Sequence, residues 1–174
     1  MKTVSASRCV MNEIVLPNDT NNLGNLMGGR LLYWMDICAA ISAQRHSNLV
    51  CVTAAVDFVE FNAPIRKGDV VVLESQVNRA FNTSLEVEIN VWAENPRAQT
   101  KRKCNRAFYT FVALDEAGQK HPAPPIQPET EDEEERYEHA ARRREIRLFM
   151  SGRLKIEEAT YIKNDLLAAL QAGA

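Results

Sequence analysis

The stretch from Asn21 to Gln44, NNLGNLMGGRLLYWMDICAAISAQ, constrains the fold more than any other part of the chain. It begins with turn-forming residues, continues with two glycines, and becomes a long run of apolar residues that would cover every face of a helix. A helix that is apolar all round is either buried in a core or spans a membrane. The run is short for a membrane span and carries Arg30 and Asp36, which favours a core helix. We therefore expect the rest of the chain to wrap around it.

One acidic residue, Asp36, interrupts this apolar helix. A carboxylate in such a place needs a partner, water or a catalytic task, because burying it alone is costly. The glycine-rich helix start leaves free backbone N–H groups that can hold an anion or a polarised oxygen. Asn25, Gly28, Gly29 and Asp36 are therefore candidate active-site residues. The alternative is a capped, buried helix whose Asp is satisfied by backbone or by a neighbouring chain.

Five segments outside the helix have strand character and are separated by turns rich in Pro, Asn and Gly. In the second segment the alternate apolar residues share one face. In the fourth, the apolar residues are predicted to point inward and Glu86, Glu88 and Asn90 outward. The order is one strand, one long helix and four strands, which predicts an α+β fold with a curved antiparallel sheet of about five strands wrapped round the helix. The predicted strands cover residues 5–16, 50–62, 70–80, 84–94 and 100–114.

The chain is expected to hold one domain, residues 1–122, and a charged helical extension, residues 123–174. Four prolines in the segment from His121 to Pro128 mark the boundary. Acids dominate residues 129–138 and arginines dominate residues 142–147, an order that suits a helix dipole and a solvated helix. Residues 153–174 are predicted to form a further, weaker helix.

Composition limits the possible partners and the compartment. The net charge of −2 gives no general attraction to nucleic acid, and the N-terminus is too polar for a signal peptide. The four cysteines form no C-x-x-C pair, so we expect them to be buried and reduced, and the protein to be cytoplasmic. No membrane insertion is expected. The cysteines are Cys9, Cys38, Cys51 and Cys104.

Two other groups of residues could form sites. Histidines lie far apart in the sequence, at His46, His121 and His139, which argues against a zinc site or a Cys–His nucleophile pair. A basic group on one predicted strand, with Arg79 on a nearby one, is either a solvated face or a site for the phosphates of a charged ligand. Its members are Lys101, Arg102, Lys103 and Arg106.

The central motif resembles the hotdog-fold acyl-CoA thioesterases, and among them the cytosolic acyl-CoA hydrolase branch. The resemblance rests on the run from Asp19 to Gly29, DTNNLGNLMGG, followed by a helix that carries W34-M35-D36. It extends over about residues 8–150. The supporting segments, in the same order as in the family, are V56-D57-F58, N62-A63-P64-I65, K67-G68-D69, T83-S84-L85-E86-V87 and A107-F108-Y109-T110-F111-V112-A113.

This resemblance implies hydrolysis of fatty acyl-CoA to free acid and CoA, at the interface of a homodimer that is commonly built into a trimer of dimers, a hexamer. Asp36 of one subunit would be the general base and Asn25 of the partner would orient the water or thioester. The N–H groups of Gly28 and Gly29 would form an oxyanion hole. No metal or cofactor is expected, and CoA enters only as part of substrate and product. The predicted substrate contacts are Trp34, Asn62, Arg79, Thr83, Ser84, Lys101, Arg102, Lys103 and Arg106.

Two alternatives stay open from the sequence. One is a non-catalytic hotdog protein that binds acyl-CoA or a nucleotide, or serves only as a scaffold. The other is a dehydratase on the same fold, which usually needs an active-site His. None of the three histidines lies in the central motif, which weighs against the dehydratase.

Overall fold

The computed structural model describes residues 1–57 and 59–164. The chain forms two compact units, one covering residues 1–127 and one beginning at Pro128. The predicted boundary lies at residue 122. Residues 126–127 belong with the first unit because they form a short strand, β7 (Ile126–Gln127), that pairs with β1 (Lys2–Thr3).

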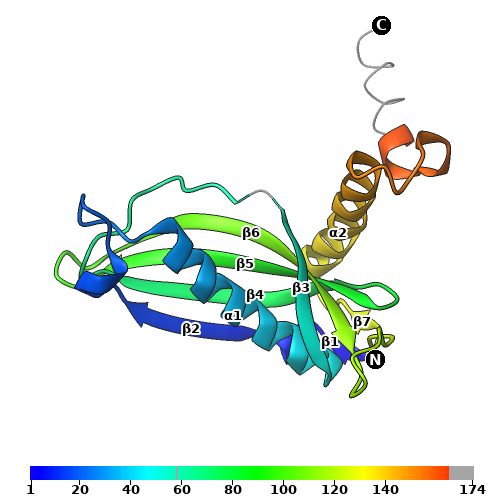
Figure 1. The fold of residues 1–174 in the computed structure, drawn as a ribbon, viewed down its shortest axis with the longest axis horizontal. Coiled ribbons are helices and arrows are strands. Elements are labelled where there is room, and N and C mark those ends of the chain that lie inside the picture. The colour runs from blue at the N-terminus through cyan, green and yellow to red at the C-terminus, as the bar shows by residue number, and fades with distance from the viewer. Residues whose placement is uncertain (58, 165–174) are drawn as a thin grey trace, which may run out of the picture. The chain divides into compact units, whose positions relative to one another are not determined.

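The first unit is a five-stranded antiparallel sheet with one long helix, α1 (Gly28–Ser47), across it (Figure 1). The expected α+β architecture of a sheet and a long helix is therefore confirmed. The first predicted strand is shorter than expected, because residues Ser5–Ser7 form a 3-10 helix before it, and a second one follows at Pro17–Asp19. The sheet order is β2-β4-β5-β6-β3, with β2 (Cys9–Ile14), β3 (Val50–Asp57), β4 (Val70–Ala80), β5 (Ser84–Asn95) and β6 (Thr100–Leu114).

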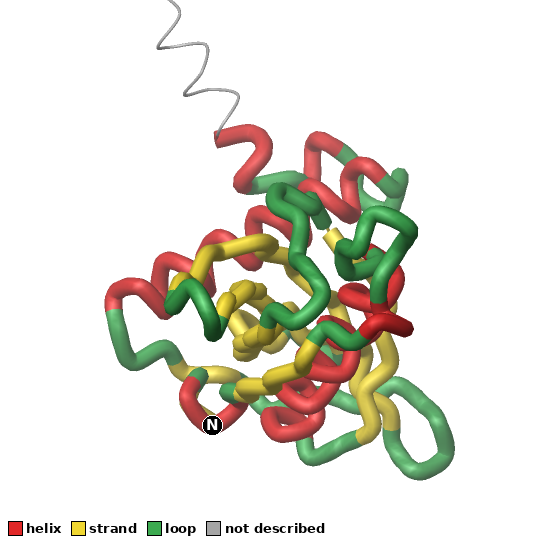
Figure 2. The backbone as a smooth tube through the Cα atoms, turned by 90° about the vertical axis from the view of Figure 1, so that its left-hand side faces the viewer, coloured by secondary structure: helices red, strands yellow, loops and turns green. Residues whose placement is uncertain are grey.

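Helix α1 packs against one face of the curved sheet (Figures 1 and 2). Its residues Met35, Cys38 and Ala39 are fully buried, and all four cysteines of the chain are buried and free, as predicted. The helix is not buried all round, however, since Tyr33 is 56% exposed. No helix of the described part of the chain is long and apolar enough to cross a membrane.

Buried in the last turns of α1, His46 has no exposed surface. Its Nε2 lies 2.7 Å from the carbonyl oxygen of Pro124, and its Nδ1 has no hydrogen-bond partner among residues 1–57 and 59–164. Burial lowers the pKa of His46, and the positive charges of Lys2 and the N-terminus act in the same direction. The imidazole is therefore held neutral in the folded chain.

Strand β3 forms one edge of the sheet and shows its apolar residues to the outside. A bulge between Thr53 and Ala55 interrupts the alternation on which the single apolar face was predicted. Val50 and Val52 lie on the face of the sheet away from Thr53, and after the bulge Val56 lies on the face of Thr53 and Tyr109. They are 62%, 44% and 41% exposed, so the edge strand carries exposed apolar side chains on both faces. Phe58, the last member of the predicted face, lies outside the described residues. An uncovered, apolar edge strand is a surface that proteins usually pair or cover.

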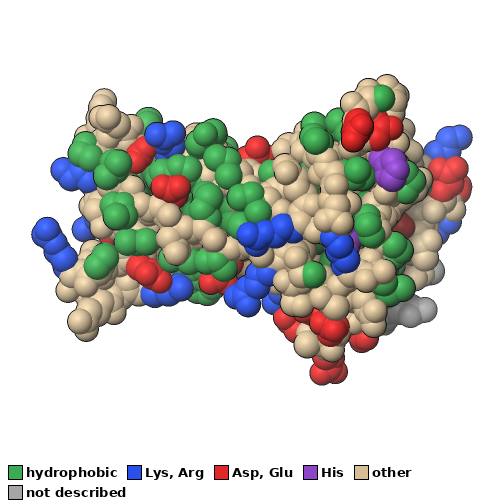
Figure 3. All heavy atoms as spheres, turned by 90° about the horizontal axis from the view of Figure 1, so that it is seen from below, with side chains coloured by type: hydrophobic (Ala, Val, Ile, Leu, Met, Phe, Trp, Pro, Cys, Tyr) green, Lys and Arg blue, Asp and Glu red, His purple; other side chains and the backbone are tan. Residues whose placement is uncertain are grey.

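The other edge strand, β2, exposes Val10 and Ile14. Hydrophobic side chains gather on the side of the molecule on which β2 lies (Figure 3). Both edges of the sheet thus carry exposed apolar residues.

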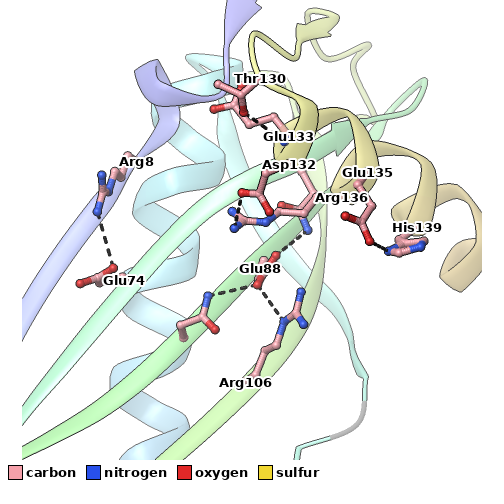
Figure 4. Close-up of polar contacts among 12 residues, drawn as sticks. Arg8, Glu74, Glu88, Arg106, Thr130, Asp132, Glu133, Glu135, Arg136 and His139 are labelled. Carbon is pink, nitrogen blue, oxygen red and sulfur yellow. Dashed lines mark hydrogen bonds and ion pairs between the residues drawn. The ribbon is translucent and has the colours of Figure 1, made fainter. Parts of the chain in front are cut away.

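Glu86 and Glu88 lie on the face of the sheet opposite Leu85 and Val87, as predicted, but they are not solvated, since they are 1% and 2% exposed. Asn78 on β4 donates hydrogen bonds to both carboxylates, at 3.3 and 3.1 Å. Arg106 on β6 forms an ion pair with Glu88, with Nε 2.8 Å from Oε1 (Figure 4). Burial would raise the pKa of Glu88, but the charge and hydrogen bond of Arg106 outweigh it and lower the pKa. The period of two was correct, but it cannot distinguish a solvated face from a buried polar one.

The second unit contains helix α2 (Glu131–Met150). Thr130 caps its start by accepting the N–H of Glu133, and Asp132 pairs with Arg136 one turn later (Figure 4). The chain then turns back, and the carboxylate of Glu145 accepts two backbone N–H groups near the start of a helical segment at residues 161–164. The last helix was predicted from residue 153, but residues 153–160 form bends and a 3-10 helix, Ile156–Glu158, instead. Residues 165–174 lie outside the described residues.

Candidate active site

The carboxylate of Asp36 is held by one neighbour and leaves one oxygen available. Thr53 of β3 donates its hydroxyl to Oδ1 of Asp36 at 2.6 Å. The other oxygen, Oδ2, has no hydrogen-bond or ion-pair partner in the part of the chain that the structure describes. Asp36 is only partly buried, so water can reach it. A fixed carboxylate with one free oxygen in reach of water has the geometry of a general base.

The environment of Asp36 includes a buried tyrosine on β6, Tyr109, which is 1% exposed. Burial, and then the negative charge of Asp36, raise the pKa of Tyr109, so its phenol stays protonated. Neither Thr53 nor Tyr109 was predicted as a site residue. The signal for Thr53 was a single polar residue in the apolar run VCVTAAV of the edge strand.

The start of α1 offers two unpaired backbone donors. The N–H groups of Gly28 and Gly29 have no acceptor among the described residues. A Cβ on Gly28 would lie 3.2 Å from the ring of Phe61, whereas a Cβ on Gly29 would meet nothing within 4 Å. Phe61 and Leu31 line a cavity of about 400 Å³ beside Gly28. A carbonyl oxygen in this cavity could accept hydrogen bonds from the helix start.

The loop before α1 is ordered by its own polar groups. The side-chain oxygen of Asn21 accepts the N–H groups of Leu23 and Asn25, at 3.0 and 3.2 Å. Asp19, 4% exposed, accepts the Nε of Arg30 at 2.7 Å, and this hydrogen bond lowers the pKa of Asp19. The Asp19–Arg30 hydrogen bond therefore holds the loop against the first turn of the helix. The side-chain NH2 group of Asn21 remains available to donate a hydrogen bond to a ligand.

The two halves of the candidate site are far apart in one chain. Gly28 and Asp36 are eight positions apart in α1, or about 12 Å at 1.5 Å per residue. A reacting carbonyl and its attacking water must approach within about 3.5 Å. One protomer therefore cannot present its own helix start and its own Asp36 to the same thioester.

The predicted substrate contacts are distributed over both ends of the sheet. Asn62 is exposed in the loop before β4, and Lys101, Arg102 and Lys103 begin β6, at the end where α1 begins. Arg79, Thr83 and Ser84 lie at the β4–β5 turn, at the other end of a strand about 36 Å long. Trp34 is buried, with the guanidinium carbon of Arg30 5.8 Å from its ring centroid.

The four basic residues of β6 are engaged within the chain. Lys101 pairs with Glu94 at 3.1 Å, and Arg106 pairs with Glu88. The ammonium groups of Lys101 and Lys103 each lie 5.5 Å from the ring centroid of Trp92. Arg102 donates to the carbonyl of Pro64 and to the carboxylate of Asp69.

Sequence comparisons identify related proteins. The model of the thioesterase superfamily matches residues 23–99. Mouse acyl-coenzyme A thioesterase 11 is 40% identical over 83% of this chain, which spans only 24% of that enzyme. The uncharacterized acyl-CoA thioester hydrolase YkhA of Bacillus subtilis is 42% identical, over 73% of this chain and 74% of that protein.

Solved structures with the same fold include three acyl-CoA hydrolases or thioesterases. The acyl-CoA hydrolase of Bacillus cereus has a TM-score of 0.83 at 37% identity, covering 97% of both chains. A hexameric acyl-CoA thioesterase has the same score and identity, covering 87% of this chain and 98% of that one. The Staphylococcus aureus hydrolase, solved with butyryl-CoA and CoA, has a TM-score of 0.81 at 31% identity, covering 99% of both. Variants of the Staphylococcus aureus enzyme replace an Asn, an Asp 15 positions later, and a Thr a further 17 positions on.

Proposed function

Because the chain belongs to the thioesterase superfamily and has its hotdog fold, we propose that it hydrolyses acyl-CoA to a free carboxylic acid and CoA. The single observation that carries this proposal is Asp36, whose Oδ1 is fixed by Thr53 while Oδ2 stays open to water. Several relatives are named acyl-CoA thioesterases or hydrolases. Others are named cytosolic enzymes, which supports a cytoplasmic location.

The proposed active site is composite, with groups from two copies of the chain. The separation of about 12 Å between Gly28 and Asp36 supports it, because a chain's own helix start is too far from its own Asp36, and a second copy can supply a helix start closer to it. The exposed apolar edge of β3 supports it as well, since pairing two such edges about a two-fold axis covers both. Asp36 faces Thr53 on this same edge strand. Because solved relatives are hexamers, the dimer is proposed to form a trimer of dimers.

In the proposed reaction, Asp36 takes a proton from water as the water oxygen bonds to the thioester carbon. The N–H groups of Gly28 and Gly29 of the partner subunit stabilise the negative oxygen that develops. The C–S bond then breaks, and the CoA sulfur leaves as a thiolate that takes up a proton. Thr53 acts through Asp36 by fixing its rotamer. The reaction as written needs neither metal nor cofactor.

Two asparagines are candidates for the group that orients the water or thioester. Asn25 is the residue predicted from the sequence, and it lines the cavity beside Gly28. Asn21 is favoured by spacing, because Asn21, Asp36 and Thr53 repeat the intervals of 15 and 17 positions among the residues replaced in the Staphylococcus aureus enzyme. Its side chain is also held by two backbone N–H groups. The substitutions Asn21→Ala and Asn25→Ala distinguish the two candidates, since only replacement of the orienting residue should lower kcat strongly.

Three of the remaining predicted contacts fit this proposal only across subunits. Arg79, Thr83 and Ser84 lie at the far end of the sheet from Gly28, so they would reach a substrate bound at another subunit's helix start. The acyl chain is proposed to lie along α1 near Trp34, and Asn62 to contact the CoA arm. For the basic residues of β6, internal pairing weakens the predicted phosphate contact.

Release of free thiol from acyl-CoAs of increasing chain length tests the proposal against the non-catalytic alternative. Wild-type protein should release CoA, and Asp36→Asn should lower kcat about a hundredfold to ten-thousandfold, the usual contribution of a general base. Binding of acyl-CoA without thiol release from any substrate would instead support the binding protein.

A further inference from the structure

A second cavity, of about 460 Å³, lies next to the cavity at the helix start and is lined by two cations, Arg66 and Lys67. We propose that these two residues, rather than the basic group of β6, hold the phosphate groups of the CoA nucleotide. This inference rests on the proposed function for the identity of the ligand.

The turn that carries these cations is fixed by backbone hydrogen bonds to the loop before α1. Lys67 donates its N–H to the carbonyl of Gly24 at 3.1 Å, and Leu26 donates to Ile65 at 2.7 Å. Gly68, at a φ of +87°, completes the turn in a conformation that other residues rarely adopt. The backbone that carries the two cations is therefore held against the loop that leads into the helix start.

The only carboxylate of this turn is used internally. Asp69 is 3% exposed, and its Oδ2 accepts the backbone N–H of Arg66 at 3.1 Å and the Nη2 of Arg102 at 3.3 Å. The side chains of Arg66 and Lys67 are exposed and have no ion-pair partner in the described residues. Because Asp69 is engaged elsewhere, the charges of Arg66 and Lys67 are not neutralised within the turn, and they can bind an anion.

The two cavities share Asn25 and Pro64, so they lie side by side. The outer one is lined by the cations and Thr20, and the inner one by Gly28 and, apart from Asn25, by apolar side chains. CoA has the same order, with charged phosphates at one end, a neutral pantetheine arm, and the thioester at the other end. Phosphates in the outer cavity would therefore direct the thioester toward the helix start.

The test compares substrates with and without phosphates. For the double variant Arg66→Gln with Lys67→Gln, we expect the KM for acyl-CoA to rise at least about tenfold, as for the loss of charge-assisted hydrogen bonds. The kcat should change little, because these contacts are equal in ground and transition state. Acyl thioesters of N-acetylcysteamine, which carry no phosphate, should show the same KM with variant and wild type. Raising the salt concentration should weaken acyl-CoA binding to the wild type more than to the variant.

A matched control removes the same two charges elsewhere, from Arg97 in a turn and Lys120 at an isolated β-bridge, both exposed. It should leave both substrates unaffected. A KM for acyl-CoA that the turn variant does not change, or that only Lys101→Gln with Lys103→Gln raises, would overturn the inference.

Calorimetric binding of CoA keeps this inference separate from the proposed activity. CoA should bind more weakly to the turn variant, and pantetheine should bind both proteins alike. If the wild type released no thiol but lost CoA affinity on this double substitution, the phosphate site would stand and the hydrolase proposal would fail. Equal CoA affinity in an active enzyme would refute the phosphate site alone.

Discussion

Mixing two inactive variants tests whether the active site is shared between subunits. One variant, Asp36→Asn, keeps the side-chain shape and an acceptor for the Thr53 hydroxyl, so the fold should persist while the base is lost. The other, Asn21→Ala, removes a group of the helix-start side. If each site takes Asp36 from one chain and Asn21 from the other, a mixed dimer rebuilds one complete site.

The expected magnitude follows from the symmetry of the dimer. Each variant alone should be slower than the wild type by about a hundredfold or more, which is 2.7 kcal/mol or more in transition-state free energy. Random exchange of equal amounts makes about half of the dimers mixed, and each mixed dimer has one intact and one doubly defective site. Activity on mixing should therefore rise to about a quarter of the wild-type value, far above either variant.

The assay is thiol release after the two variants are denatured together and refolded, with each variant refolded alone as control. If both groups act within one chain, every site in the mixture keeps one defect and mixing restores nothing. That result would refute the composite site and the argument from the separation of about 12 Å. The same experiment with Asn25→Ala decides between the two asparagines. Only the variant that lacks the orienting residue should be inactive alone and regain activity when it is mixed with Asp36→Asn.

Three further predictions follow from single contacts. Thr53→Val keeps the side-chain shape but removes the hydrogen bond to the carboxylate of Asp36, the proposed base, so steady-state kinetics should show kcat about tenfold lower with KM little changed; an unchanged kcat would exclude a positioning role. Gly28→Ala puts a methyl group 3.2 Å from the ring of Phe61 and should impair hydrolysis, while Gly29→Ala, which meets nothing within 4 Å, should impair it less; the reverse order in a thiol-release assay would contradict the cavity beside the helix start. His46 has a lowered pKa in the folded chain, so its contribution to stability is present above its unfolded pKa of about 6.5 and is lost as pH falls below that value; urea unfolding between pH 7.5 and 5.5 should show a smaller loss of stability for His46→Gln than for the wild type.

The fold could be predicted well because its main signals are local. Alternation and turn residues located β4 at residues 70–80, the bounds that the structure has. The apolar run after Gly29 located α1, since no other segment could supply a central helix. The buried state of Glu86 and Glu88 could not be predicted in the same way. Their partners are on other strands, and sequence periodicity carries no information about cross-strand partners.

Only some residues of the candidate site could be predicted from the sequence, for a related reason. Asp36 stood out because an acid among apolar helix residues violates the local pattern. Thr53 did not, because threonine is common in strands and its importance depends on a contact across 17 positions. Arg66 and Lys67 looked like ordinary turn residues beside a richer basic group on β6. Internal pairing of that group, which only the structure shows, changes which cations are free.

Association of two chains would both cover the exposed edge of β3 and complete the proposed site near Asp36. An edge strand with Val50, Val52 and Val56 exposed is an aggregation hazard for a monomer, and its apolar surface gains most when an identical edge covers it. Thr53, which hydrogen-bonds Asp36, lies on the same strand, so the edge strand that favours pairing also holds the proposed base. Association and catalysis are therefore expected to depend on the same residues, and an unpaired protomer should have little activity even when its fold is intact.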